Sequence, residues 1–269
     1  MKRPDRLVLL GHPVRHSLSP RFQNAALKAA GIELTYEPLD VPPGELTQRL
    51  AELKLARAAG NVTVPHKAAV AAACDRQTLM AQRTGAVNTF WCADDNRLVG
   101  DNTDVAGFRA LATSIVGREP RDAIVALLGA GGGAAAVCAV VEEWTGARIQ
   151  VHALGKARAT ELAKRFPGLV SVASSLSDAL DQATIVINAT PLGLEGDEVP
   201  VDVTLLPRDA AVMDLAYRAG ETPWVRAARL AGHRAADGLE MLIAQGAEAF
   251  ERWFGQPADR DVMRAALAA

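Results

Sequence analysis

The sequence predicts an α/β protein built from two domains, and three observations support this. Short apolar runs alternate with helical patterns through the first hundred residues, beginning at Leu7–Leu10. A second series starts soon after Asp104 with the continuous apolar run Ile124–Leu128. The chain has 269 residues, 49% hydrophobic and 22% charged, so it can bury two modest cores. Strands that alternate with helices in this way indicate mostly parallel sheets.

In the first domain, strands are expected at Leu7–Leu10, near Leu34–Leu39 and at Asn61–Val64. Ser19 followed by Pro20 predicts a helix start, with the serine as N-cap and the proline at the first helical position. Pro65 predicts the start of a further, alanine-rich helix.

In the second domain, a glycine cluster follows the strand Ile124–Leu128. Further elements are expected as a helix at Ala134–Trp144 and strands at Ile149–Ala153, Thr184–Ile187 and Ala211–Leu215. Near the end, Ile243, Ala247, Phe250 and Phe254 fall on one face of a helix, which we expect to return to the first domain. The predicted domains are 1–104, completed by 238–269, and 105–237.

Composition excludes several classes of function. The net charge of -2 provides no field for nucleic acid or an anionic membrane, and no apolar run approaches the roughly 18 residues of a membrane span. The apolar run at the start ends at Gly11 and Pro13, which favours a first strand over an export signal. Three widely separated cysteines suit a reducing cytoplasm, and His12 and His16 flank a proline, so no metal site is expected.

The segment Gly129-Ala130-Gly131-Gly132-Gly133-Ala134 lies between a predicted strand and a predicted helix. Glycines there permit a tight turn and close approach of a pyrophosphate, and the helix N-terminus supplies N–H donors. The strand–loop–helix context favours a Rossmann-type dinucleotide site over a purely structural loop.

Lys67 follows a predicted strand and lies in the first turn of the helix opened by Pro65. The helix dipole disfavours a cation there, so this lysine can exchange a proton with a substrate oxygen. Asp104, in the run Gly100–Asp104, is a candidate partner, although such a run is also typical of a turn or cap. Ser17 and Ser19 flank a helix start; capping accounts for Ser19 but leaves Ser17 without a structural role.

Taken together, the motifs HSLSP, NVTVPHK, GAVNT, GDNTD, GAGGG, NATPLG and DGLEMLIAQ resemble the shikimate dehydrogenase family, in the family's order and over about residues 11–255. The resemblance implies an N-terminal substrate domain, a Rossmann-type domain and C-terminal helices that return to the first. It implies Lys67 as catalytic lysine with Asp104 as its carboxylate partner. It further implies a set of substrate contacts: Ser17 and Ser19 for the carboxylate, Thr63, Asn88, Asp104 and Gln245 for ring hydroxyls, and Tyr217.

The resemblance also implies a nicotinamide cofactor. Its pyrophosphate would lie on Gly129, Ala130, Gly131, Gly132 and Gly133, and its nicotinamide end near Met213 and Gly238. Relatives that use NADP carry Asn-Arg-Thr after the second Rossmann strand, and relatives that use NAD carry an acidic residue there; this chain has Ala153-Leu154-Gly155. Lys156 and Arg158 are the nearby cations, so NADP is expected and NAD is the alternative.

The expected activity is reversible NADPH-dependent reduction of 3-dehydroshikimate to shikimate by a monomer or homodimer. One alternative is a paralogue that acts on quinate or an amino-substituted analogue with NAD. Another is a non-catalytic sensor of shikimate or nucleotide. The presence of both Lys67 and Asp104 argues against the sensor, because binding alone does not require a proton donor.

Overall fold

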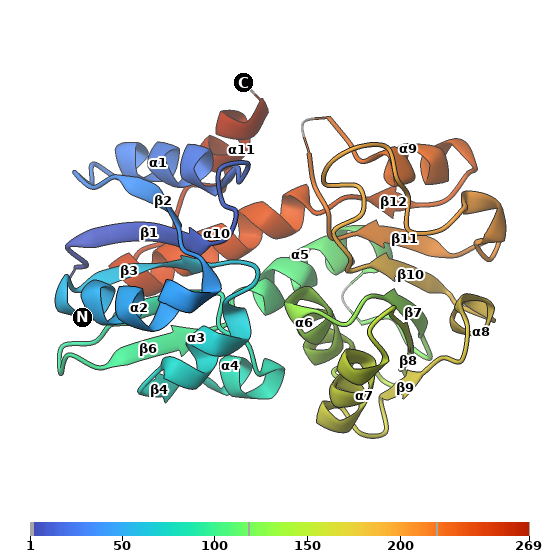
Figure 1. Ribbon diagram of the computed structural model, residues 1–269. Coiled ribbons are helices and arrows are strands. Elements are labelled where there is room, and N and C mark those ends of the chain that lie inside the picture. The colour runs from blue at the N-terminus through green and yellow to red at the C-terminus, as the bar shows by residue number, and fades with distance from the viewer. Residues whose placement is uncertain (1–2, 118, 219, 269) are drawn as a thin grey trace. The chain divides into compact units, whose positions relative to one another are not determined.

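The computed structural model describes residues 3–117, 119–218 and 220–268 and divides the chain into two units. Unit 1 comprises Met1–Ala106 and Leu242–Ala269, and unit 2 comprises Gly107–Met241. Each unit has its own sheet (Figure 1), and the C-terminal helices belong to unit 1, as predicted. No helix of the described residues is long and apolar enough to cross a membrane.

Unit 1 contains a mixed sheet with strand order β2-β1-β3-β5-β6-β4. Its strands are β1 (Arg6–Gly11), β2 (Tyr36–Asp40), β3 (Ala58–Val62), β4 (Arg76–Gln77), β5 (Thr89–Cys92) and β6 (Leu98–Asp101). Its helices are α1 (Ser19–Ala29), η1 (Pro43–Glu45), α2 (Leu46–Leu55), α3 (Lys67–Ala73), α4 (Leu79–Thr84) and α11 (Arg260–Ala268). Helices α5 (Asp104–Val116) and α10 (Leu239–Phe254) carry the chain from one unit to the other.

Strand β1 lies parallel to both β2 and β3, whereas β5 runs antiparallel to β3 and β6. Thr89 on β5 is paired with Asn61 on one side and with Asp101 on the other. The beginning of β5 therefore lies between the ends of β3 and β6. Helices α1 and α11 pack against each other (Figure 1).

Unit 2 contains a parallel sheet with strand order β12-β11-β10-β7-β8-β9. Its strands are β7 (Ile124–Leu128), β8 (Arg148–His152), β9 (Val170–Val172), β10 (Ile185–Asn188), β11 (Ala211–Asp214) and β12 (Ala235–Ala236). Its helices are α6 (Gly132–Val141), α7 (Lys156–Arg165), α8 (Leu176–Leu180), η2 (Val203–Leu205) and α9 (Pro223–Leu230). The chain winds outward from β7 to β9 and then from β10 to β12, which is the Rossmann order with its switch point between β7 and β10.

Three sequence-based boundaries in unit 1 were wrong. Strand β3 covers Ala58–Val62 rather than Asn61–Val64, because small buried residues extend it at its beginning. Helix α3 begins at Lys67, two residues after Pro65. Ser19 is the first helical residue of α1 rather than its cap, and Leu18 occupies the N-cap without a side-chain hydrogen bond.

Candidate functional site

The carboxyl ends of β3 and β6 bring Lys67 and Asp104 together. Lys67 Nζ donates a 2.6 Å hydrogen bond to Asp104 Oδ2, and the two side chains are 19% and 8% exposed. Asp104 opens α5, where the helix dipole favours a carboxylate. Because both groups are largely shielded from water, their attraction is screened less than that of a surface pair.

Asn88, directly before β5, connects this pair to α10. Its amide nitrogen donates to Asp104 Oδ1 at 2.7 Å and to Gln245 Oε1 at 3.3 Å. The backbone N–H of Thr103 donates to Asn88 Oδ1 at 2.7 Å, which fixes the orientation of the amide. Lys67, Asp104, Asn88 and Gln245 therefore form one hydrogen-bonded chain within unit 1.

Both carboxyl oxygens of Asp104 accept hydrogen bonds, one from Lys67 and one from Asn88. The carboxylate can therefore hold the Lys67 ammonium in one direction. A positioned ammonium can give a proton to an oxygen on which negative charge develops, and take it back in the reverse reaction.

Three other predicted substrate residues lie in unit 1 outside that chain. Ser17 Oγ accepts a hydrogen bond from the backbone N–H of Ser19 at 3.2 Å, so Ser17 has the structural role at the helix start that we had expected of Ser19. Ser17 is half-buried and Ser19 is buried. Thr63 is half-buried just after β3, and its backbone N–H donates to Leu10 O at 2.8 Å.

The glycine loop of unit 2 follows β7 beside the switch point. Gly129 has φ +104°, and a Cβ there would lie 2.9 Å from the carbonyl carbon of Ala189 on the loop after β10. A Cβ on Gly131 would meet nothing within 4 Å. Gly131 is also the N-cap of α6 and makes no side-chain hydrogen bond there. The loop thus has a tight turn, open space and free helix N–H groups, which together suit a pyrophosphate.

The loop after β8 lies at the same edge of the sheet and has little to hold an adenine ribose. Leu154 is completely exposed, and Gly155 caps α7 without a side chain. Lys156 and Arg158 are exposed, and neither forms an ion pair with the described residues. Arg158 Cγ and Cδ lie 4.0 Å from the position that a Cβ on Gly155 would take, so this side chain folds back over the start of α7.

The remaining predicted residues of unit 2 lie in β11, on the loop after it, and just after β12. Met213 is fully buried within that strand, and Tyr217 lies on the loop after it. Gly238 donates its N–H to Ala216 O at 2.9 Å, and a Cβ there would lie 2.8 Å from the carbonyl carbon of Leu215. The backbone after β11 is thus packed tightly against the segment that leads into α10.

Asp214, the last residue of β11, is a functional candidate that the sequence did not reveal. The side chain is fully buried and accepts hydrogen bonds from Asn188 Nδ2 at 2.8 Å, Ala216 N at 3.0 Å and Thr222 Oγ1 at 2.7 Å. Burial raises the pKa of Asp214 to about 6 although these hydrogen bonds oppose the rise. This carboxyl joins the end of β10 and the loop after β11 to the start of α9.

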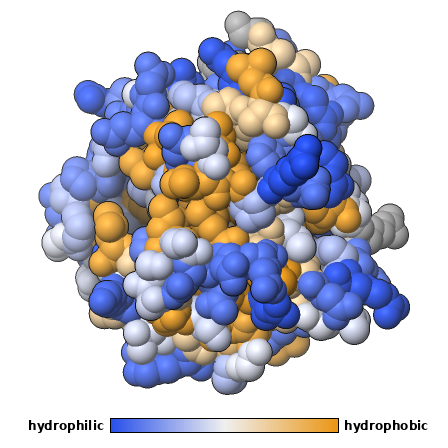
Figure 2. Space-filling view, turned by 90° about the vertical axis from the view of Figure 1, so that its right-hand side faces the viewer, coloured by the Kyte–Doolittle hydropathy of each residue, from blue (hydrophilic) through white to orange (hydrophobic). Residues whose placement is uncertain are grey.

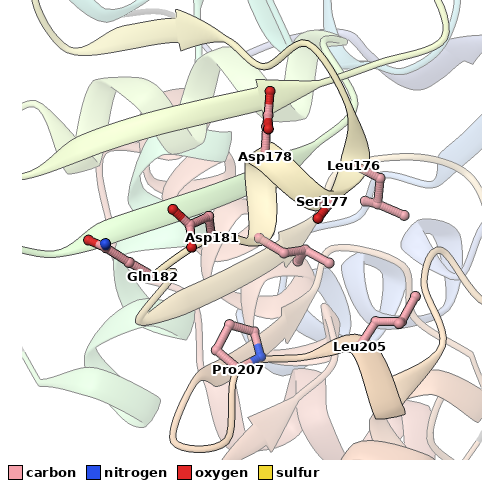
Figure 3. A pocket seen from close by; sticks show the side chains of 8 residues that line it. Leu176, Ser177, Asp178, Asp181, Gln182, Leu205 and Pro207 are labelled. Carbon is pink, nitrogen blue, oxygen red and sulfur yellow. The ribbon is translucent and has the colours of Figure 1, made fainter.

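A pocket of about 490 Å³ lies elsewhere in unit 2 (Figure 3). Its lining comes from α8, the turn after it, and the segment of η2 and Pro207, all of which precede β10 or β11. In a parallel sheet these segments lie at the amino ends of the strands, opposite the glycine loop. Apolar side chains also gather on the face of the molecule in Figure 2 among hydrophilic ones. The pocket does not belong to the candidate site.

Comparison with known proteins agrees with this geometry. Residues 9–90 match the family model "Shikimate dehydrogenase substrate binding domain", and residues 238–268 match "Shikimate 5'-dehydrogenase C-terminal domain". The shikimate dehydrogenase (NADP(+)) of Rubrobacter xylanophilus is 42% identical over 267 residues, covering 96% of this chain and 94% of that protein.

Two solved structures extend the likeness to the fold. Shikimate dehydrogenase from Aquifex aeolicus has a TM-score of 0.90 at 32% identity and covers all of both chains. Shikimate 5-dehydrogenase from Thermus thermophilus, solved with NADP(H) and shikimate, has a TM-score of 0.84 at 38% identity and covers 97% of this chain and 98% of that one. This chain belongs to the shikimate dehydrogenase family.

Proposed function

We propose that this protein is an NADP-dependent shikimate dehydrogenase that reversibly reduces 3-dehydroshikimate to shikimate. The observation that carries the proposal is the Lys67–Asp104 pair, joined through Asn88 to Gln245. A proton donor held next to amide groups suits a ring that carries one reacting oxygen and several hydroxyls. The family relatives carry this activity in their names.

In the direction of reduction, the Lys67 ammonium would give its proton to the carbonyl oxygen as that oxygen becomes an alcohol. In the reverse direction, neutral Lys67 would take the hydroxyl proton, and Asp104 would hold the amine in place in both. When bound, the nicotinamide cofactor supplies or accepts the hydride at the ring carbon. The protein holds the reacting atoms at the correct distance and orientation, which lowers the entropic cost of reaching the transition state.

The other substrate contacts follow from the resemblance and from their places in unit 1. Ser17 and Ser19 would hold the carboxylate, and Thr63, Asn88 and Gln245 would bind the ring hydroxyls. Tyr217 of unit 2 would provide a further contact. A cytoplasmic location suits three cysteines that are far apart in the sequence.

The cofactor site fits a dinucleotide at the glycine loop. The pyrophosphate would lie on Gly129–Gly133, and Met213 and Gly238 belong to the segments expected at the nicotinamide end. For the 2′-phosphate of NADP, Lys156 and Arg158 are the cations at the start of α7. They would replace the arginine that other relatives carry at the position of Leu154.

The test is steady-state turnover on shikimate and on quinate, each with NADP and with NAD. We expect shikimate with NADP to give the highest kcat/KM. Turnover of quinate with NAD in preference to shikimate would instead identify a paralogue. Binding of shikimate without turnover by either cofactor would support a sensor and overturn the proposal.

A further inference from the structure

Polar contacts at Gln245, Gly246 and Arg252 attach helix α10 to the rest of unit 1. Gln23 Nε2 on α1 donates to Gly246 O at 3.0 Å, and Asn88 Nδ2 donates to Gln245 Oε1 at 3.3 Å. Arg252 Nε donates to Asp101 Oδ2 at 3.0 Å, and this third contact is an ion pair. Asp101 is the last residue of β6 and directly precedes the turn that leads to Asp104.

Asp101 is well suited to fix this turn. Its side chain is 5% exposed and accepts hydrogen bonds from Thr78 Oγ1, from the backbone N–H of Asn102 at 2.7 Å and from Arg252. Its backbone carbonyl accepts the N–H of Asn88 at 3.1 Å. One residue thus contacts both Asn88 and the helix that carries Gln245.

Gln245 and Arg252 are seven residues apart, or two helical turns, and therefore lie on the same face of α10 about 10 Å apart. The first contacts Asn88 and the second contacts Asp101. Buried apolar side chains such as Phe250 and Trp253 hold α10 in the core, and two polar contacts along one face add a constraint on its rotation and on its position along its axis. Glu248, one turn before Arg252, holds the guanidinium by a second ion pair of 2.8 Å.

We propose that Arg252, through Asp101, is a positioning residue that sets the place of Gln245 in the substrate site. The role rests on the proposed function, because Gln245 is a substrate contact only if the ring binds beside Lys67. Without the Arg252 side chain, α10 would keep its contact with α1 but could rotate or slide relative to Asn88. The Asp101 carboxylate would also lose its cation while still buried, whereas its hydrogen bonds from Thr78 and Asn102 would hold the turn before Asp104 in place.

The expected effect is on substrate binding rather than on the proton transfer. Gln245 would contact a ring hydroxyl and not the reacting oxygen, so its displacement removes binding that the ground state and the transition state share. We expect Arg252→Met, which keeps the apolar stem, to raise the KM for shikimate roughly five- to tenfold. The kcat and the KM for NADP should change less than about twofold.

A double-mutant cycle distinguishes positioning from general support of the fold. If Arg252 acts through Gln245, Arg252→Met should raise KM much less in a Gln245→Ala background than in the wild type. Arg252→Lys should recover part of the loss, and Asp101→Asn should resemble Arg252→Met. Arg49→Met is the matched control. Arg49 is also a helical arginine of unit 1, but it forms ion pairs with Glu45 and Glu52, which are close to it in the sequence.

The possible results separate the two proposals. If the wild type is active and Arg252→Met raises KM equally in the wild type and in the Gln245→Ala background, the positioning role alone is overturned. A variant with a lowered melting temperature but wild-type KM would overturn it as well. A wild type that does not turn over shikimate would overturn the proposed function, and the positioning role with it.

Discussion

Lys67 is the residue whose replacement tests the proposed proton transfer most directly. Its Nζ lies 2.6 Å from Asp104 Oδ2. Lys67 is the first residue of α3, and Asp104 is the first residue of α5. We expect Lys67→Ala to fold and to bind shikimate nearly as well as the wild type. Its kcat should fall by roughly two to four decades, the range for loss of a positioned proton-transfer group. Stopped assays and shikimate titrations would measure both quantities, and near-wild-type turnover would show that the proton takes another route.

At the scale of single residues, the sequence predicted the pairing of Lys67 with Asp104 but not the residues around them that hold the turn in place. Lys67 and Asp104 were predicted as a pair, and the structure places them in contact. Asp101 and Arg252 were not singled out, because they lie 151 positions apart and only the folded chain brings them together. A charged residue at the end of a buried strand was the available signal for Asp101. The expected role of Ser19 at the helix start falls instead on Ser17, since the helix begins one residue earlier than a cap at Ser19 requires.

The loops at the carboxyl ends of β10 and β11 depend on a buried carboxyl. Because the pKa of Asp214 is about 6 in the folded protein and 3.8 as a reference, the folded state binds more protons between these values. The stability contributed by this group is therefore complete below pH 3.8 and falls as the pH rises through 6, by roughly 3 kcal/mol. Asp214→Asn keeps an oxygen for Asn188 and Ala216 and has no such decline.

The free energy of unfolding of Asp214→Asn relative to the wild type should thus increase between about pH 4 and pH 7. Urea denaturation at fixed pH values would measure it. Asp209→Asn, at an exposed position before β11, is the control and should follow the wild-type pH dependence. Parallel profiles for Asp214→Asn and the wild type would show that Asp214 does not carry this pH dependence.

The start of α7 is the element that should set cofactor preference. Lys156 and Arg158 are exposed, and such a solvated contact to a phosphate contributes about 1 kcal/mol, or roughly fivefold. We expect both cofactors to work, with a modest preference for NADP that shrinks as salt screens the contact. Replacing both cations by alanine should abolish the preference and leave the kinetics with NAD nearly unchanged. Strict NAD dependence, or a large NADP preference that salt does not affect, would falsify this account.

Across the whole molecule, the sequence predicted the fold class, the Rossmann-type sheet and the return of the C-terminal helix. The strand at Ile124–Leu128 was predicted with its correct bounds, since its apolar run is bounded by a glycine loop. Strands β5 and β6 were not predicted, because the polar motifs beside them are typical of turns as well. These two strands make the sheet of unit 1 mixed rather than parallel, and they bring Asn88 beside Asp104. The pairing of Thr89 in β5 with Asn61 in β3 joins residues far apart in the sequence, and local patterns do not contain such a pairing.

Unit 1 is formed by two separate segments of the chain, and this predicts what a shortened chain would lose. Helix α11 packs against α1, which begins at Ser19, and Met263 of α11 is fully buried. A chain that ends at Gln256 should therefore lose shikimate binding while unit 2 still binds NADP. Calorimetric titration with each ligand would measure this. Wild-type affinity for shikimate in the shortened chain would show that α1 does not need α11.

The same arrangement bears on how the protein is made. Unit 2 is complete at residue 241, whereas unit 1 lacks its last segment until Leu242–Ala269 has been synthesised. At about 5–20 residues per second, the ribosome needs roughly ten to thirty seconds to pass from residue 106 to the end. During that interval α1 has no α11 to cover it, and its apolar side is open to other nascent chains and to chaperones. Synthesis of unit 1 thus starts before that of unit 2 and finishes after it. Gln245 joins the site only when this last segment of unit 1 has been made.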